Sequence, residues 1–127
     1  MPEAPLVAIV DDNRSIREAT SNFLQAVGLC TATFDDARSF LQSARRRSTA
    51  CLITDVRMPG INGFELHQEL IASGDGIPTV LITAYLDDSV RARARAAGIV
   101  CCLAKPFAPA ELLDCVREAL AKFSRGS

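Results

Sequence analysis

Short apolar runs alternate with longer amphipathic segments along the chain. Five runs span residues 6–10, 29–34, 51–54, 79–83 and 100–103. They are apolar on both sides, which is typical of parallel strands that are covered on two faces. The run at 29–34 mixes in polar residues, so we expect it to lie at an edge of the sheet.

A segment with helical periodicity follows each run. Asn13 is placed as the N-cap of the first helix and Gly28 as its stop, and Gly98 closes a fourth helix that begins near Asp87. Pro109 lies in the first turn of the last helix, where a missing N–H costs nothing. The apolar positions expected on the buried faces are Ile16, Phe23, Leu24, Val27, Ala37, Phe40, Leu41, Ala44, Phe64, Leu66, Leu70, Ile71, Leu112, Leu113, Val116, Leu120 and Phe123.

This alternation predicts one α/β domain over residues 1–123. Five β-α units in succession form a doubly wound parallel sheet with right-handed crossovers and helices on both faces. No repeat, linker or low-complexity segment interrupts them. Residues 124–127 are polar, and we expect a flexible tail or the start of a linker there.

Composition narrows the class of protein. The 127 residues carry a formal net charge of −1, which argues against nucleic-acid binding by the domain as a whole. The run Arg45–Arg47 is expected to be a solvated helix end. No apolar stretch approaches the roughly 20 residues that span a bilayer, and the first residues lack the layout of a signal peptide. We therefore expect a cytoplasmic protein without membrane contacts.

The five cysteines do not form a recognisable motif. Their number is odd, no CxxC pair occurs, and Cys51, Cys101 and Cys102 sit inside strand-like runs. Buried, reduced thiols are therefore expected rather than a redox centre. The residues are Cys30, Cys51, Cys101, Cys102 and Cys115.

The strand ends carry the candidate chemistry. Asp11 and Asp12 follow the first run, Asp55 the third, Thr83 ends the fourth and Lys105 follows the fifth. In a doubly wound sheet, ligands bind at the carboxyl ends of the strands. Each residue has an ordinary alternative: either aspartate of the pair could cap the first helix, and the threonine and lysine are common types. Their joint occurrence at separate strand ends favours a site.

Carboxylates, hydroxyl and ammonium together suit phosphoryl chemistry. Three clustered carboxylates raise each other's pKa, a conflict that Mg²⁺ or Mn²⁺ relieves with its preference for oxygen ligands. A carboxylate such as Asp55 can attack phosphorus and form an acyl phosphate. Lys105 and Thr83 can then bind phosphoryl oxygens, together with backbone N–H groups after Asp55 and at Ala84.

The segments around these residues resemble the receiver domains of bacterial two-component response regulators. They read IVDDN at 9–13, TDVRMPGING at 54–63, LITAY at 81–85 and AKPF at 104–107. The resemblance extends over residues 6–123, and the motifs DVRMPGING and AKPF are most similar to those of the FixJ-type subgroup. It implies a CheY-like, flavodoxin-like fold with strand order 2-1-3-4-5.

The resemblance also implies roles at the metal site. Asp55 would be the phosphoacceptor. Mg²⁺ would be held by Asp55, Asp12, the backbone carbonyl of Arg57, and Asp11 mainly through water. Gly63 would help to shape the loop after Asp55.

Further implied roles concern the phosphoryl group. The backbone amides of Val56 and Ala84 would bind its oxygens, Lys105 would pair with it, and Thr83 would move toward it on activation. The Lys105–Pro106 peptide would be cis.

One position departs from the family pattern. Receivers usually carry Tyr or Phe three residues before the lysine, and this ring turns inward when the threonine moves. Here the position is Cys102, which cannot make the same packing change. Tyr85, two residues after Thr83, is expected to lie over the site and to influence access of water.

The leading functional hypothesis is a phosphorylation-dependent switch rather than an enzyme. A sensor histidine kinase would be the donor, and output would follow by homodimerisation through the fourth helix, fifth strand and fifth helix, or by partner binding. Transcriptional regulation is expected if a DNA-binding domain follows Ser127.

Two alternatives stay open. An aspartyl phosphatase would need a general acid two residues after the nucleophile, where Arg57 stands. A degenerate receiver would act as a constitutive interaction module.

Four further side chains are expected to have no specific functional role. His67 lies on a helix without a second metal ligand at i+4, and it is not expected to take part in phosphorelay. Arg91 and Arg95 share one face of the fourth helix, while Arg93 points elsewhere. They could bind an acidic surface or simply be solvated.

Overall fold

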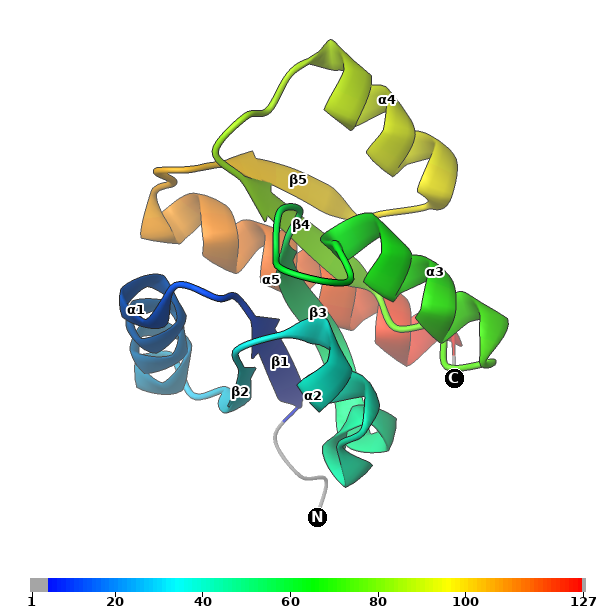
Figure 1. Ribbon diagram of the computed structural model, residues 1–127. Coiled ribbons are helices and arrows are strands. Elements are labelled where there is room, and N and C mark those ends of the chain that lie inside the picture. Colours follow the sequence, from blue (N-terminus) through cyan, green and yellow to red (C-terminus); the bar gives the residue numbers. More distant parts are fainter. Residues whose placement is uncertain (1–4, 127) are drawn as a thin grey trace.

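The computed structural model describes the backbone of residues 5–126 and the side chains of residues 5–123. Its parallel strands form one sheet in the order β2-β1-β3-β4-β5. Helices pack on both faces of this sheet (Figure 1). The predicted α/β fold, its strand order and the edge position of the second strand are thus confirmed.

The bounds of the elements lie close to the expected ones. The strands are β1 (Leu6–Val10), β2 (Cys30–Phe34), β3 (Thr49–Asp55), β4 (Thr79–Thr83) and β5 (Cys101–Ala104). The helices are α1 (Arg14–Ala26), α2 (Ala37–Leu41), α3 (Gly63–Ala72), α4 (Asp88–Ala97) and α5 (Pro109–Gly126), and a 3-10 helix, η1 (Ala44–Ser48), precedes β3. No helix in the described part of the chain combines the length and the apolar character needed to cross a membrane.

Three clusters of buried apolar side chains hold the layers together. Helices α1 and α5 cover one face of the sheet, where Leu24 and Val116 pack on Ile53. Helices α2 and α3 cover the other face through Phe40 and Leu66, and α4 joins them beside β4 (Figure 1). The apolar runs of the sequence are buried on both sides for this reason.

Helix boundaries follow local capping chemistry. The side chain of Asn13 accepts a hydrogen bond from Ile16 N–H, and Asp87 caps Val90 N–H in the same way. Gly28 and Gly98 follow the helices with φ of 94° and 79°, which favours glycine.

Some sequence expectations are wrong. Val27, Ile71 and Phe123 are 43%, 54% and 40% exposed, because only part of each apolar stripe reaches the sheet. Ala44 belongs to η1 rather than to α2. Helix α5 continues to Gly126, since no helix breaker precedes this glycine, and its backbone thus extends into the segment for which a flexible tail or the start of a linker is expected; Ser127 lies outside the described residues.

The arginine run at 45–47 also differs from the expectation. It forms most of η1, and Arg46 is not simply solvated. Its guanidinium donates hydrogen bonds to Asp75 Oδ2 at 2.8 Å and to the Leu41 carbonyl at 2.9 Å. Arg46 therefore ties the loop before β3 to the loop before β4.

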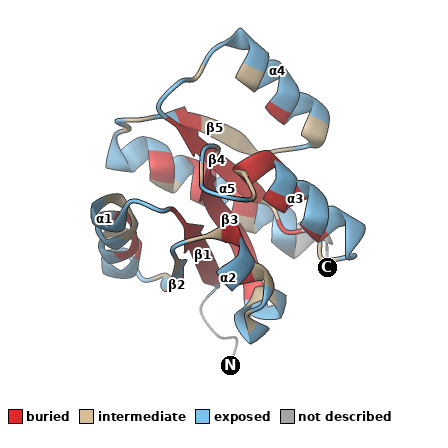
Figure 2. Ribbon diagram, viewed as in Figure 1, coloured by how far each residue is buried: buried red, intermediate tan, exposed pale blue. Residues whose placement is uncertain are grey.

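Helix α4 is the most shallowly packed of the long helices. Ala94 is its one buried residue, and most of its surface is exposed in Figure 2. By contrast, every residue of β1, β3 and β4 is buried. The sheet is therefore a rigid base, and α4 lies at its margin.

Candidate functional site

The carboxyl ends of four strands bring the predicted residues to one edge of the sheet. Asp55 is the last residue of β3 and Thr83 the last of β4, while Asp11 and Lys105 directly follow β1 and β5. Lys105 Nζ lies 3.1 Å from Asp11 Oδ2 and 2.5 Å from Asp55 Oδ2. The ammonium group of Lys105 thus binds two carboxylates, those of Asp11 and Asp55, which precede it in the chain by 94 and 50 positions.

Three carboxylates form the acidic cluster. Asp11, Asp12 and Asp55 each offer a ligand oxygen, and these atoms lie within 4.8 Å of one another. Asp11 and Asp55 are buried, whereas Asp12 is exposed to solvent. Asp11 Oδ1 also accepts a hydrogen bond from Asn13 N–H at 2.8 Å. Burial raises the pKa of Asp11 above its usual range, which the bonds from Asn13 and Lys105 only partly offset.

Lys105 balances only part of this charge. Burial works against its ammonium form, but the hydrogen bonds to Asp55 and Asp11 outweigh burial and raise the pKa of Lys105. One ammonium faces three carboxylates, so the cluster keeps excess negative charge when all are ionised. Oxygen-only ligands with excess negative charge and one solvent-facing member fit a hard divalent cation.

The backbone amide of Val56, which is expected to bind a phosphoryl oxygen, already has a partner in the sheet. The Val56 N–H donates to the Ile82 carbonyl at 2.9 Å and continues the ladder between β3 and β4. It is therefore not directed at a phosphoryl position. The next amide, Arg57 N–H, donates to Asp55 Oδ1 at 3.0 Å.

Gly63 allows the loop to close on the strand. Its N–H donates to the Val56 carbonyl at 3.0 Å, and a Cβ at this position would collide with the carbonyl oxygen of Asp55. Asn62 and Glu65 form a reciprocal capping box that begins α3 at this point. The start of α3 and the end of β3 are therefore locked together, which orients Asp55.

Thr83 connects the fourth and fifth strand ends. Its side chain is buried, and its hydroxyl oxygen accepts a hydrogen bond from Tyr85 N–H at 3.1 Å. Its carbonyl accepts from the Lys105 N–H at 2.8 Å. The Lys105–Pro106 peptide is cis, as expected.

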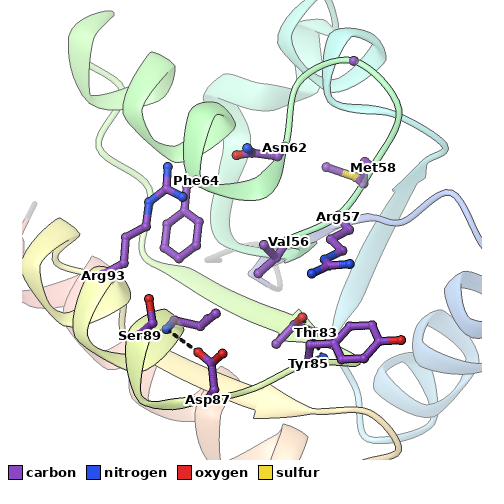
Figure 3. A pocket seen from close by; sticks show the side chains of 12 residues that line it. Val56, Arg57, Met58, Asn62, Phe64, Thr83, Tyr85, Asp87, Ser89 and Arg93 are labelled. Atoms are coloured by element: carbon purple, nitrogen blue, oxygen red, sulfur yellow. Dashed lines mark hydrogen bonds between the residues drawn. The ribbon is translucent and has the colours of Figure 1, made fainter.

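A cavity of about 480 Å³ opens beside this edge, between the loop after β3 and the loop after β4. Figure 3 shows Arg57 and Tyr85 facing each other across it, and Thr83 lies next to Tyr85. The Arg57 guanidinium carbon lies 4.7 Å from the centroid of the Tyr85 ring, a cation–π geometry. The Tyr85 ring is 64% exposed, so this contact lies at the mouth of the site.

The cysteines do not share one environment. Cys51 and Cys115 are buried, Cys101 and Cys102 are half-buried, and Cys30 is exposed. The expectation of buried thiols is therefore wrong for Cys30 and only partly right for the pair on β5. All five are free thiols.

Cys102 lies under α4, where it borders a small pocket with Arg91 and Arg95. Burial raises the pKa of this thiol, and Arg91 opposes the shift. Arg93 points elsewhere, as expected, with its guanidinium 4.2 Å above the Phe64 ring.

The sequence pattern missed two contacts. Arg17 Nη1 donates to the Asp11 carbonyl at 2.7 Å and supports the first strand end from α1. His67, expected to have no specific role, is buried, and both of its ring nitrogens form hydrogen bonds. Neither contact had a signal in the sequence, because both depend on which elements become neighbours.

Comparison with known proteins agrees with this geometry. Residues 7–117 match the response regulator receiver domain. Nodulation protein W of Bradyrhizobium diazoefficiens is 40% identical over 111 residues, which cover 87% of this chain and 49% of that protein. Transcriptional regulatory protein FixJ of Azorhizobium caulinodans is 34% identical over 122 residues, covering 96% of this chain and 58% of FixJ.

A solved structure shows the same likeness. Response regulator StyR superimposes with a TM-score of 0.89 and 41% identity, over 97% of this chain and 62% of StyR. The chain spans about half the length of the curated relatives described above. The family match covers most of the chain and includes the acidic strand ends, Thr83 and Lys105. The chain therefore belongs to the response regulator receiver domain family.

Proposed function

We propose that the domain is a phosphorylation-dependent switch of a two-component system, with Asp55 as the phosphoacceptor. The observation that carries this proposal is the placement of the Asp55 carboxylate. One of its oxygens is held by Lys105 Nζ and the other by Arg57 N–H, beside the carboxylates of Asp11 and Asp12. This fixes the nucleophile and places its countercharge in advance.

Mg²⁺ or Mn²⁺ is the proposed cofactor. Its protein ligands would come from Asp12, Asp55 and the Arg57 carbonyl, with Asp11 acting mainly through water. The raised pKa of the buried Asp11 and the incomplete balance by Lys105 support a cation here. When bound, a divalent ion supplies charge compensation for phosphoryl oxygens.

The remaining contacts suit a phosphoryl group on Asp55. In the transfer, a carboxylate oxygen of Asp55 forms a bond to phosphorus while the P–N bond of a phosphohistidine breaks. Lys105 Nζ is already at the carboxylate. The Thr83 hydroxyl oxygen accepts from Tyr85 N–H, which leaves its hydrogen for a phosphoryl oxygen. The amides of Arg57 and Ala84 complete the proposed set, and Arg57 replaces Val56, whose N–H is used in the sheet.

The donor is proposed to be a sensor histidine kinase that docks beside Lys105. An apolar groove of about 440 Å³ runs between α1 and the start of α5, and Lys105 itself lines it. Ile16, Phe23 and Phe107 are among the apolar side chains that line it. A helix that presents a phosphohistidine to Asp55 would cover this groove. Phe107→Ala is expected to slow transfer from the kinase about tenfold, and unchanged labelling by acetyl phosphate is the control.

Output is proposed to occur by homodimerisation through α4, β5 and α5. Arg91 and Arg95 are exposed on α4, and Glu111, Asp114 and Glu118 are exposed on α5. In a two-fold symmetric pair, the basic helix of one copy can face the acidic helix of the other. Size-exclusion chromatography with and without beryllofluoride tests this, and Arg91→Glu is expected to prevent dimerisation.

Acetyl phosphate with Mg²⁺ tests the function directly. We expect one alkali-labile phosphoryl group per chain by intact mass, and none in Asp55→Asn. Many turnovers per chain would instead indicate a phosphatase. Absence of labelling, or beryllofluoride binding that changes no amide resonance between residues 84 and 104, would indicate a constitutive interaction module.

A further inference from the structure

The turn between β1 and α1 (Figure 1) carries two of the three carboxylates of the acidic cluster. Asp11 is buried, and both of its carboxylate oxygens have partners. Oδ1 accepts from Asn13 N–H at 2.8 Å, and Oδ2 accepts from Lys105 Nζ at 3.1 Å. Asp12 is exposed, and in the part of the chain that the structure describes no hydrogen bond or ion pair holds its carboxylate. The direction of the Asp12 side chain therefore depends on how its backbone is held.

Two peptide planes flank the Cα atom of Asp12, and a side chain fixes each of them. The Asp11 carbonyl oxygen, which lies in the first plane, accepts a hydrogen bond from Arg17 Nη1 at 2.7 Å. The Asn13 N–H, which lies in the second plane, donates to Asp11 Oδ1. Because a peptide group is planar and resists rotation, an anchored atom on each side of Asp12 restricts both of its backbone torsion angles.

Helix α1 holds Arg17 in the place that this contact needs. Asn13 caps the helix, and its carbonyl accepts the Arg17 N–H at 3.0 Å, so Arg17 lies in the first turn. Its half-buried side chain reaches back over the end of β1, where Asp11 N–H donates to the Phe34 carbonyl at 3.1 Å. Asp11 is thus anchored to β2 through its N–H and to α1 through its carbonyl. Within residues 5–123 the Arg17 guanidinium forms no ion pair, so the carbonyl contact is what fixes it.

Charge alone would give Arg17 the opposite effect on a cation. A guanidinium near the acidic cluster repels a divalent ion, so its removal would tighten metal binding if repulsion dominated. Arg17 donates to a neutral carbonyl and therefore occupies no carboxylate oxygen itself. The repulsion of a half-exposed charge is screened by solvent, whereas contacts that orient the ligands of a metal ion typically change its affinity by roughly 10- to 100-fold. Orientation therefore outweighs repulsion at this site.

We propose that Arg17 is a positioning residue for the cation site, and that its bond to the Asp11 carbonyl orients Asp12 for direct binding of Mg²⁺ or Mn²⁺. This role rests on the proposed function, which places the cation at the acidic cluster. Without the bond the turn can move, so the cation must order it on binding and its affinity falls. Phosphoryl transfer on the fully loaded domain stays the same, since Asp55 and Lys105 keep their contacts.

Mg²⁺ titration of the metal-free protein tests this role. Arg17→Gln should bind Mg²⁺ about tenfold more weakly than the unsubstituted domain, and Arg17→Lys, which keeps a charged donor on a long side chain, should recover most of the loss. Arg14→Gln is the matched control, because Arg14 is exposed on the same helix and pairs with Glu18; its affinity should stay within about twofold. Equal or tighter binding by Arg17→Gln overturns the positioning role alone. Absence of Mg²⁺ and Mn²⁺ binding by the unsubstituted domain overturns the cofactor of the proposed function instead.

Labelling by acetyl phosphate separates positioning from general damage to the site. The Mg²⁺ concentration for half-maximal labelling should rise about tenfold in Arg17→Gln, while the rate at saturating Mg²⁺ should stay within about twofold of the original. A fall in the saturated rate with an unchanged half-maximal concentration overturns the positioning role.

The turn can also be observed without any substitution. In the metal-free unsubstituted domain, the backbone order parameters of Asp12 and Asn13 should match those of the sheet at about 0.85, although Asp12 is exposed. Values below about 0.6 would show that the turn is mobile before the cation binds, and they overturn the proposal even if Arg17→Gln does not fold.

Discussion

The phosphoacceptor edge and helix α4 are held in opposite ways. At the edge, Asp55 is buried and linked to three other strand ends or loops by Lys105, Arg57 N–H and the closely packed Gly63. Helix α4 buries only Ala94 and depends on a few polar and cation–π contacts. A switch needs both conditions: a preorganised site for the chemistry, and an element whose position changes at small cost.

Thiol reactivity should separate the two regions most strongly. Cys51 lies at the centre of β3, and burial raises its pKa to about 12, so almost no thiolate forms at pH 8. Cys102 is half-buried under α4 and becomes accessible when this helix opens locally. Iodoacetamide should modify Cys102 about a hundredfold faster than Cys51, as followed by peptide mass spectrometry. Exposed Cys30 is the positive control. Equal modification rates for Cys51 and Cys102 would contradict the difference in local stability between the sheet and α4.

Gly63→Ala should be the most destabilising small substitution at the edge. The new Cβ collides with the Asp55 carbonyl, which is main-chain and cannot move independently, so we expect a loss of about 3 kcal/mol. Urea unfolding measures the free energy. Gly76→Ala is the matched control, because nothing lies within 4 Å of its Cβ, and it should change stability by less than about 0.5 kcal/mol. Similar values for both variants would show that α3 can move away from β3.

Asp11→Asn should stabilise the domain when divalent ions are absent. Burial raises the folded-state pKa of Asp11, so the ionised carboxylate costs stability above that pKa. At pH 7 the variant should therefore be more stable than the unsubstituted domain. The gain should shrink as pH falls below the folded pKa, and it should vanish below the ordinary pKa of an aspartate, where the carboxyl is protonated in the folded and the unfolded state alike. Unfolding with excess EDTA between pH 3 and pH 7 measures this.

The matched variant is Asp12→Asn, whose carboxylate is exposed. It should give a smaller gain, since solvent screens its repulsion from the other carboxylates. Mg²⁺ should stabilise the unsubstituted domain and reduce the advantage of both variants. A destabilised Asp11→Asn at pH 7 without metal would mean that Lys105 fully compensates the buried charge.

Arg93→Ala on α4 should have the smallest effect. It removes the cation–π contact with Phe64, which is worth about 0.5–1 kcal/mol at a partly exposed site. Arg91→Ala, from another face of the same helix, should leave stability unchanged within experimental error. Urea unfolding compares the two. A loss above 2 kcal/mol for Arg93→Ala would contradict the shallow attachment of α4.

Much of the fold and the acidic site could be predicted because both depend on local patterns. Apolar runs and caps such as Asn13 and Asp87 define where strands and helices begin. In a parallel sheet every strand points the same way, so residues at strand ends, Asp55 and Lys105 among them, meet at one edge regardless of their separation in the chain.

What the sequence by itself determined was therefore the alternation of elements and the chemistry at the strand ends. The tertiary structure alone decided which hydrogen bonds form there. Val56 N–H donates to the Ile82 carbonyl, and Arg57 N–H donates to the Asp55 carboxylate. His67 forms a hydrogen bond with the Ala97 carbonyl. Such contacts depend on register and on the packing of helices that are distant in the chain. Periodicity records which face of a segment is apolar, and it carries no information on the partner that a polar atom will meet there.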